Sequence, residues 1–285
     1  MTIPGFALVL AAAFCHATWN FFLKRINGGL ELVWLFSVVS VLLYLPIAAY
    51  FVITNGVSFG LRELVFIAGS AALHLGYFLF LQTGYRKGDL SLVYPTARAT
   101  GPFLSASFAV MVLGEQMTLQ IALGAIAVIV GVVCLTGGFR NGAKNLSASF
   151  GFGIGAGTLI GSYTVWDAYA VSTLLIPPLL LDYASSVGRS VVLAPIAARR
   201  MKLVKSCWQD HRAGVVAIAV LNPLAYILVL YALTFTPVVY VAPTREISVL
   251  LTVLMGSVLL GEGDLKRRMI WATFILAGVI LLATG

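Results

Sequence analysis

Long apolar runs alternate with short polar or Gly/Pro-containing breaks along the whole chain of 285 residues. A run of about 20 apolar residues forms a helix long enough to cross the ~30 Å hydrocarbon core of a membrane. Where only Phe235-Thr236-Pro237 separates two runs, the helices on either side must be antiparallel. The pattern predicts an all-α integral membrane protein with ten transmembrane helices. Their expected positions are residues 4–23, 31–53, 64–84, 90–113, 119–136, 149–170, 175–198, 213–235, 238–260 and 268–284.

The composition excludes an ordinary soluble protein. Charged residues make up 10% of the chain and apolar residues 60%, whereas a soluble domain carries about 25% charged residues. A net charge of +8 would suit nucleic-acid binding only with a basic face on a soluble fold, so no nucleic-acid partner is expected. Cys15, Cys134 and Cys207 have no metal-ligand spacing and are interpreted as small apolar fillers, so no metal site is expected.

Basic residues are distributed unequally over the connections between the ten predicted helices. Fourteen of the 18 Lys and Arg residues fall on connections that share one side of the membrane, and Arg62 alone falls on the other. Basic residues near helix ends stay in the cytoplasm. The distribution therefore predicts that both termini lie outside. The protein is expected to be a multi-pass protein of the bacterial inner membrane.

The second half of the chain repeats the first at a shift of about 147 residues. Val93-Tyr94-Pro95-Thr96-Ala97-Arg98 recurs as Val241-Ala242-Pro243-Thr244-Arg245, and Leu113-Gly114-Glu115 recurs as Leu260-Gly261-Glu262. The predicted organisation is a first repeat over residues 1–137, a cytoplasmic linker over 138–148 and a second repeat over 149–285. Because each repeat holds five helices, an odd number, the second copy enters the membrane from the opposite side.

Inverted repeats are typical of secondary transporters, whose binding site lies between the repeats near the middle of the membrane. The repeat therefore favours transport by alternating access through a central cavity. No phosphate-binding loop, zinc-protease motif or serine nucleophile motif is present, so an enzyme is not expected. The alternatives are a non-transporting membrane subunit and an intramembrane enzyme that handles lipids.

The motifs resemble the EamA-type branch of the drug/metabolite transporter superfamily. The resemblance rests on His16-Ala17-Thr18-Trp19-Asn20 followed by Lys24, and on the Pro-Thr-x-Arg and Leu-Gly-Glu stretches of each repeat. It implies ten helices, no bound cofactor and a cavity lined by the first four helices of each repeat. It also implies export of a small metabolite, such as an amino acid or another solute with an anionic group. The fifth helices, 119–136 and 268–284, are expected at the lipid-facing periphery, where they could support a homodimer.

Three arginines fall inside predicted helices, where an ionisable side chain costs about 2.5–3.5 kcal/mol and is a functional hypothesis by default. Arg98 lies about eight residues into its helix, or ~12 Å deep, and has no acidic neighbour in the sequence. Arg245 has a comparable depth, but Glu246 adjoins it and could pair with it. We expect Arg98 to contact an anionic part of the substrate, with Arg245 and then Arg189 as further candidates.

Prolines accompany two of these arginines. Pro95, Pro102 and Pro243 each remove a backbone donor, and a broken helix at that depth must be satisfied by protein or by water in a cavity. The prolines therefore predict broken helices that form a cavity wall.

Aromatic and titratable residues complete the candidate pathway. Trp19 and Asn20 have Trp166 and Asp167 as repeat mates, and these tryptophans, with Tyr94, suit the walls of a substrate path. His16, His74, Glu246 and Asp167 are candidates for a coupling proton, because histidine titrates near physiological pH. Packing is the alternative interpretation for each histidine. Gly153, Gly157 and Gly161 recur every four residues, a spacing that lets helices approach closely.

Overall fold

The structure is a computed structural model that describes residues 1–87, 90–135, 146–260 and 265–284, and every regular element in these ranges is a helix. In the first half the helices are α1 (Ile3–Ile26), α2 (Leu30–Asn55), α3 (Leu61–Lys87), α4 (Leu90–Phe108), the π-helix η1 (Ala109–Leu113) and α5 (Leu119–Leu135). In the second half they are α6 (Leu146–Ser172), α7 (Pro178–Arg199), α8 (Met201–Leu233), α9 (Val238–Thr244), α10 (Ile247–Leu260) and α11 (Leu265–Thr284).

Each of the ten predicted segments coincides with one helix or with two consecutive helices. Five of the described helices, α1, α2, α3, α7 and α8, are long and apolar enough to cross a membrane by length and composition. The expected connection over residues 199–212 is instead largely helical, because α8 begins at Met201. A kink at His211, where φ is −135°, separates this first part from the apolar remainder of α8. Most of the expected linker, residues 136–145, lies outside the described residues.

Local sequence signals account for where α1 begins and ends. The Thr2 hydroxyl accepts a hydrogen bond from the Gly5 amide at 3.3 Å, which caps the first turn. Pro4 fits the first turn because the amide it lacks has no helical partner there. Asn27 ends the helix in the left-handed conformation, with φ 52°, which asparagine tolerates better than most residues.

The prediction that prolines break both arginine-bearing helices is wrong for the first repeat. Helix α4 runs from Leu90 to Phe108 without interruption through Pro95 and Pro102, because a proline removes one hydrogen bond but keeps a helical φ. The second repeat does break, between α9 and α10. There the Glu246 amide donates to the Pro243 carbonyl at 3.0 Å, a tighter turn than an α-helix makes.

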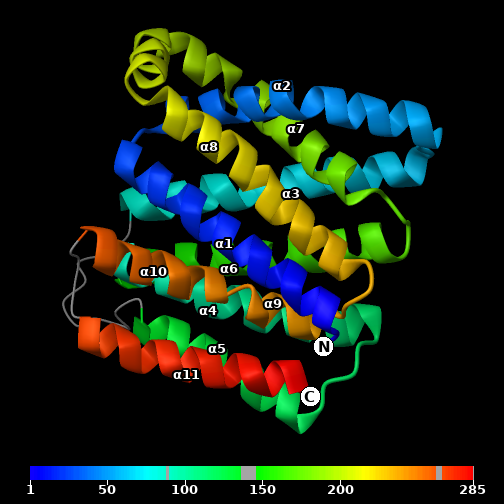
Figure 1. The fold of residues 1–285 in the computed structure, drawn as a ribbon, viewed down its shortest axis with the longest axis vertical. Helices are drawn as coiled ribbons and strands as arrows, with labels where there is room; N and C mark the ends of the chain where they lie inside the picture. The colour runs from blue at the N-terminus through cyan, green and yellow to red at the C-terminus, as the bar shows by residue number, and fades with distance from the viewer. Residues whose placement is uncertain (88–89, 136–145, 261–264, 285) are drawn as a thin grey trace.

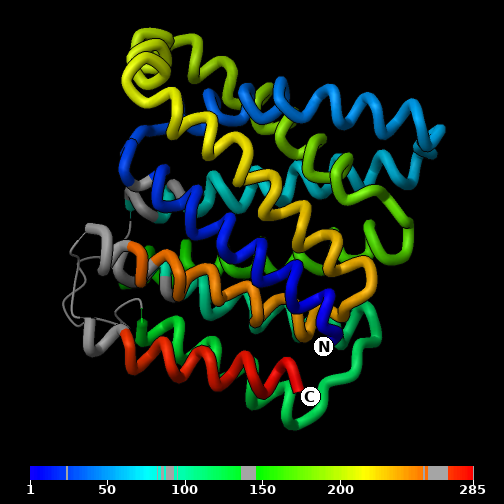
Figure 2. The backbone as a smooth tube through the Cα atoms, in the orientation of Figure 1, coloured from blue at the N-terminus to red at the C-terminus, as the bar shows by residue number. Residues whose placement is uncertain are grey.

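The two halves of the chain interlock rather than lie side by side. Helix α1 packs against α8 and α10, and its repeat mate α6 packs against α3 and α4. The mates α2 and α7 pack against each other at one end of the stack, and α5 packs against α11 at the other (Figure 1). Every one of these contacts is matched when the repeats are exchanged. Helix α6 contacts α3 of the first repeat and α8 and α9 of the second, so it lies between elements of both repeats (Figure 2).

The glycines of α6 allow close approach to α4. A Cβ built on Gly153 would lie 2.6 Å from the Thr96 Cβ, and one on Gly157 would lie 2.5 Å from the Thr100 Cβ. A Cβ built on Gly161 would lie 2.8 Å from the Leu104 Cβ. Since residues 96, 100 and 104 are also four apart, the two helices are in contact along matching faces.

Replacing Gly157 by Ala should destabilise the protein by about 1–3 kcal/mol, because the added methyl group overpacks the α4–α6 contact. The matched control is Gly151→Ala in the same helix, where an added Cβ meets nothing within 4 Å. Thermal unfolding of the detergent-solubilised variants measures the difference. Equal midpoints for the two variants would contradict the close contact described.

One acidic side chain of the first repeat caps a helix of the second. The Glu115 carboxylate accepts hydrogen bonds from the Val238 and Val239 amides, at 2.7 and 2.9 Å, at the first residues of α9. Gly114 precedes it in the left-handed conformation, with φ 69°, which a residue with a Cβ adopts at a cost. The turn between η1 and α5 thus directs a carboxylate across the interface between the repeats.

Candidate functional site

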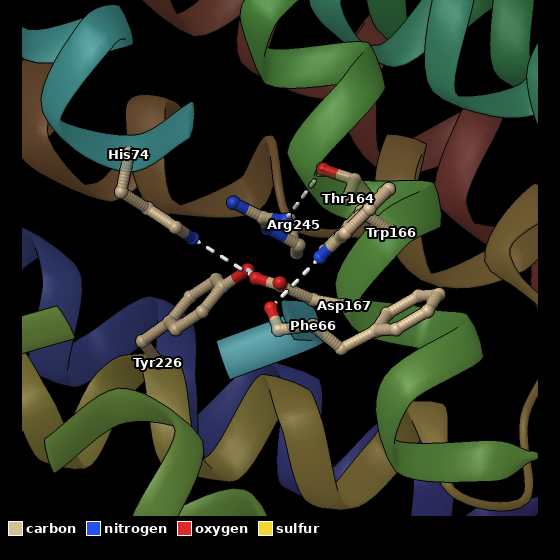
Figure 3. Close-up of polar contacts among 7 residues, drawn as sticks. All are labelled: Phe66, His74, Thr164, Trp166, Asp167, Tyr226 and Arg245. Atoms are coloured by element: carbon tan, nitrogen blue, oxygen red, sulfur yellow. Dashed lines mark hydrogen bonds and ion pairs between the residues drawn. The ribbon is translucent and has the colours of Figure 1, made fainter. Parts of the chain in front are cut away.

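A buried polar group that joins the two repeats is centred on Asp167 of α6, whose side chain has no exposed surface. Its Oδ2 atom is 2.9 Å from His74 Nε2 of α3 and accepts a 2.6 Å hydrogen bond from the Tyr226 hydroxyl of α8. Figure 3 shows both rings pointing at the carboxylate. Asp167 Oδ1 has no hydrogen-bond partner in the described part of the protein. The sequence candidates His74 and Asp167 therefore form one pair, and the pair joins the two repeats.

Aromatic rings surround this pair. The Tyr163 ring stacks on His74 with centroids 4.0 Å apart, and Tyr226 meets His74 edge-on at 4.9 Å. Tyr163 lies four residues before Asp167 and so projects from the same face of α6. The rings limit water around the carboxylate, which strengthens its electrostatic interactions.

Arg245 lies beside this group, at the break between α9 and α10. Its guanidinium carbon is 5.7 Å from the centroid of the Tyr226 ring, and NH1 is 3.5 Å from the Thr164 hydroxyl (Figure 3). Within the described residues, Arg245 has no carboxylate within 4.0 Å. Tyr226 therefore contacts both the cation at Arg245, through its ring, and the anion at Asp167, through its hydroxyl.

The acid that adjoins Arg245 in the sequence pairs with the other arginine. Arg98 NH1 of α4 is 3.5 Å from Glu246 Oε1, and these side chains are 23% and 6% exposed. The Tyr94 ring lies 5.3 Å from the Arg98 guanidinium. The alternative that Glu246 pairs with its neighbour Arg245 is not what the structure shows, because Glu246 pairs with Arg98 of the other repeat. Of these two arginines, Arg245 is therefore the one without a carboxylate within 4.0 Å among the described residues.

Arg189 of α7 lies in a different polar group, between α2, α7 and α8. Its Nε atom donates to the Ser37 hydroxyl at 2.8 Å. Its NH2 atom donates to the Ser186 hydroxyl at 3.5 Å and to the side-chain Oδ1 of Asn222 at 3.4 Å. The Phe36 ring lies 5.5 Å from its guanidinium carbon. Arg189 thus donates hydrogen bonds to three neutral acceptors. It belongs to a different polar group from Arg98 and Arg245.

The candidates on α1 form a group within that helix. Trp19 Nε1 donates to His16 Nδ1 at 3.0 Å, and Asn20 Nδ2 donates to the His16 carbonyl at 2.8 Å. His16 also interacts electrostatically with Arg245 and Arg98. Helix α1 therefore lies near Arg98 and Arg245. The hydrogen-bond donors of Trp19 and Asn20 are bound to His16 within the same helix.

Trp166, the repeat mate of Trp19, makes a different contact. Its Nε1 atom donates to the Phe66 carbonyl at 2.9 Å, and its ring stacks on the Phe66 ring at 4.2 Å (Figure 3). A Cβ on Gly69 would lie 2.6 Å from the Trp166 ring, so a glycine is needed where α3 passes the indole. The Trp166 ring therefore lies on one side of the Asp167 group.

The sequence alone did not identify Tyr163, Thr164 or Phe66 as members of this group. The spacing of four residues between Tyr163 and Asp167 is a helical signal that could have identified the tyrosine. No sequence signal identifies Thr164, Phe66 or Tyr226 as neighbours, because their contacts depend on how the two repeats interlock.

Comparison with known proteins identifies the family. The family model described as EamA-like transporter family matches residues 3–137 and 148–284. A solved structure titled "Crystal structure of protein" has a TM-score of 0.76 at 14% identity and covers 100% of this chain and 98% of its own. At that identity it supports the fold alone. No curated protein matches the chain. Because the family matches both halves of the chain, the protein belongs to the EamA-like transporter family and is a multi-pass membrane protein of the drug/metabolite transporter type.

Proposed function

We propose that this protein is a secondary transporter that exports a small organic solute carrying an anionic group. The observation that carries the proposal is Arg245, a cation at a helix break between the repeats whose described partners are Thr164, Tyr226 and Tyr163, with no carboxylate within 4.0 Å. A planar guanidinium suits a carboxylate or phosphate, to which it can donate two parallel hydrogen bonds. Arg245 thus replaces Arg98 as the first candidate for substrate contact.

The position of the rings between the repeats suits alternating access. Tyr163 and Tyr226, 6.2 Å apart between centroids, lie beside the Asp167 group, and Tyr226 also contacts Arg245. Because the repeats make matched contacts, each could open to one side of the membrane in turn, as in other inverted-repeat transporters. Tyr94, Trp19, Trp166 and Asn20 would border the same path.

Solute counterflow in proteoliposomes tests the proposal. Vesicles loaded with an unlabelled solute take up the labelled solute only if a carrier exchanges the two. The panel is L-serine, L-glutamate, succinate and glycerol 3-phosphate, which present zwitterionic, carboxylate and phosphate groups, and protein-free vesicles are the control. Uptake of at least one solute is expected. A folded protein that moves no anionic or zwitterionic solute contradicts the proposal and favours a non-transporting subunit.

The proposed orientation, ten crossings with both termini outside a bacterial inner membrane, has its own test. The Met1 ammonium donates to the Ala283 carbonyl at 3.4 Å, so the termini share a side. The last residues of α1, α3 and α7, next to basic residues, lie at the opposite end of the bundle (Figure 1). A C-terminal alkaline phosphatase fusion should therefore be active, whereas a C-terminal green fluorescent protein fusion should be dark. The opposite pattern would refute this orientation.

A further inference from the structure

The His74–Asp167 pair is the only histidine–carboxylate contact within 4.0 Å among the described residues. An ionised carboxylate only accepts hydrogen bonds, so His74 Nε2 carries the hydrogen directed at Asp167 Oδ2, and Nδ1 remains able to take a second proton. The side chain of His74 is 23% exposed and that of Asp167 is fully buried. His74 is thus the more accessible member of the pair.

The other candidates for a coupling proton are engaged elsewhere. His16 Nδ1 accepts the Trp19 indole hydrogen at 3.0 Å, which requires an unprotonated Nδ1, and two arginines act on the ring. Glu246 is paired with Arg98. Among these candidates, His74 is therefore the histidine whose imidazole lies against a carboxylate.

The charged and titratable groups around His74 come from four helices and from the helix break. Arg245 is close to Tyr226 and Tyr163, and Asp182 of α7 interacts electrostatically with Asp167 and with Arg189. Arg98 and Glu246 form a neutral pair next to Tyr77 and Tyr94. Arg189, on the same helix as Asp182, interacts with it electrostatically. The surrounding groups therefore form two sets, each with one basic and one acidic side chain. These sets are Arg98 with Glu246 and Arg189 with Asp182.

Arg245 and Asp167 also balance each other while His74 is neutral. An anionic solute at Arg245 would add one negative charge to this buried group, and one proton on His74 would restore neutrality. Burying an uncompensated charge is costly, so the anion and the proton should favour each other's binding. Their free energies of binding are then coupled, and the coupling is reciprocal.

This inference rests on the function proposed above. We propose that the His74–Asp167 pair takes up one proton when an anionic solute binds at Arg245, and that solute and proton cross the membrane together. A cell that accumulates the anion would then release it with a proton, driven by the outward gradient of the solute. Because the pair joins α3 of the first repeat to α6 of the second, its protonation also acts on the contact that must change between the two access states.

Proton binding is tested directly by nuclear magnetic resonance of protein labelled with ¹⁵N-histidine in lipid nanodiscs. The chain has three histidines, and His16→Gln, His74→Gln and His211→Gln assign their signals. The His74 signal should differ between the wild type and Asp167→Asn, because the imidazole contacts this carboxylate. At fixed pH, succinate, L-glutamate or glycerol 3-phosphate should raise the imidazolium fraction, whereas uncharged glycerol should not. A His74 signal that ignores Asp167→Asn, or ignores all three anions, would overturn the proposal.

Cotransport is tested with the pH dye pyranine trapped in vesicles loaded with each anion in turn. Outward flux of a transported anion should make the lumen more alkaline, with about one proton moved per solute. His74→Gln, which keeps an N–H donor towards Asp167 but cannot bind a proton, should bring that ratio close to zero. His211→Gln, at the kink of α8, should leave the ratio unchanged. An acidified lumen, or an unchanged ratio in His74→Gln, would overturn cotransport. Absence of counterflow for every solute would instead refute the proposed transport function, while the resonance titration still decides whether the pair binds a proton.

Discussion

Replacing Arg245 by Gln should lower solute counterflow by about 30-fold or more. Losing one partner of a buried, hydrogen-bonded charge pair costs about 2–5 kcal/mol, and 1.4 kcal/mol corresponds to a factor of ten. In the described structure the Arg245 guanidinium is held by Thr164 and the Tyr226 ring without a carboxylate. No described carboxylate within 4.0 Å therefore competes with the solute for this guanidinium. The measurement is the initial rate of counterflow with the solute that wild-type protein transports best.

Two further variants sharpen this prediction. Arg245→Lys keeps the charge but loses the planar fork of donors, so its rate should lie between those of wild type and Arg245→Gln. Lys202→Gln, which removes an exposed charge from the first turn of α8, should leave the rate within about twofold, because surface charges contribute little. If Arg98→Gln lowered the rate more than Arg245→Gln while remaining folded, the substrate contact would belong to Arg98 instead.

Replacing Glu115 by Ala should destabilise the protein by about 2–4 kcal/mol. Both carboxylate oxygens accept backbone hydrogen bonds from the first turn of α9, at 2.7 and 2.9 Å, and hydrogen bonds to charged groups contribute about 1.5–3 kcal/mol each. The negative charge also favours the positive end of the helix dipole, although α9 is short and this term is small. Thermal unfolding in detergent measures the loss.

Glu115→Gln separates the contributions to this cap. Glutamine keeps one oxygen acceptor and loses the charge, so its loss of stability should be about half that of Glu115→Ala. Gln116→Ala removes the adjacent exposed side chain and should change stability by less than about 0.5 kcal/mol. If Glu115→Ala were as stable as Gln116→Ala, the contact between the repeats would not contribute to the fold.

The sequence predicted the parts of the site that follow from position along one helix. The depth of Arg98 and the repeat match of Trp19 with Trp166 and of Asn20 with Asp167 follow from counting residues. The sequence could not predict partners, because His74 and Asp167 are 93 residues apart and Arg98 and Glu246 are 148 apart. Adjacency was also misleading: Glu246 follows Arg245 directly, yet the helix break sends the two side chains to different partners.

The apolar runs and the repeat therefore determined, from the sequence alone, that this is a helical membrane protein whose second half repeats the first. Those features are local or periodic: run length sets how far a helix reaches, and the repeat can be read by comparing the chain with itself. The tertiary structure decided which charges compensate one another. Exchanged contacts between the repeats bring His74 to Asp167 and Glu246 to Arg98, and they leave Arg245 beside neutral side chains, because electrostatic partnership depends on distance through space.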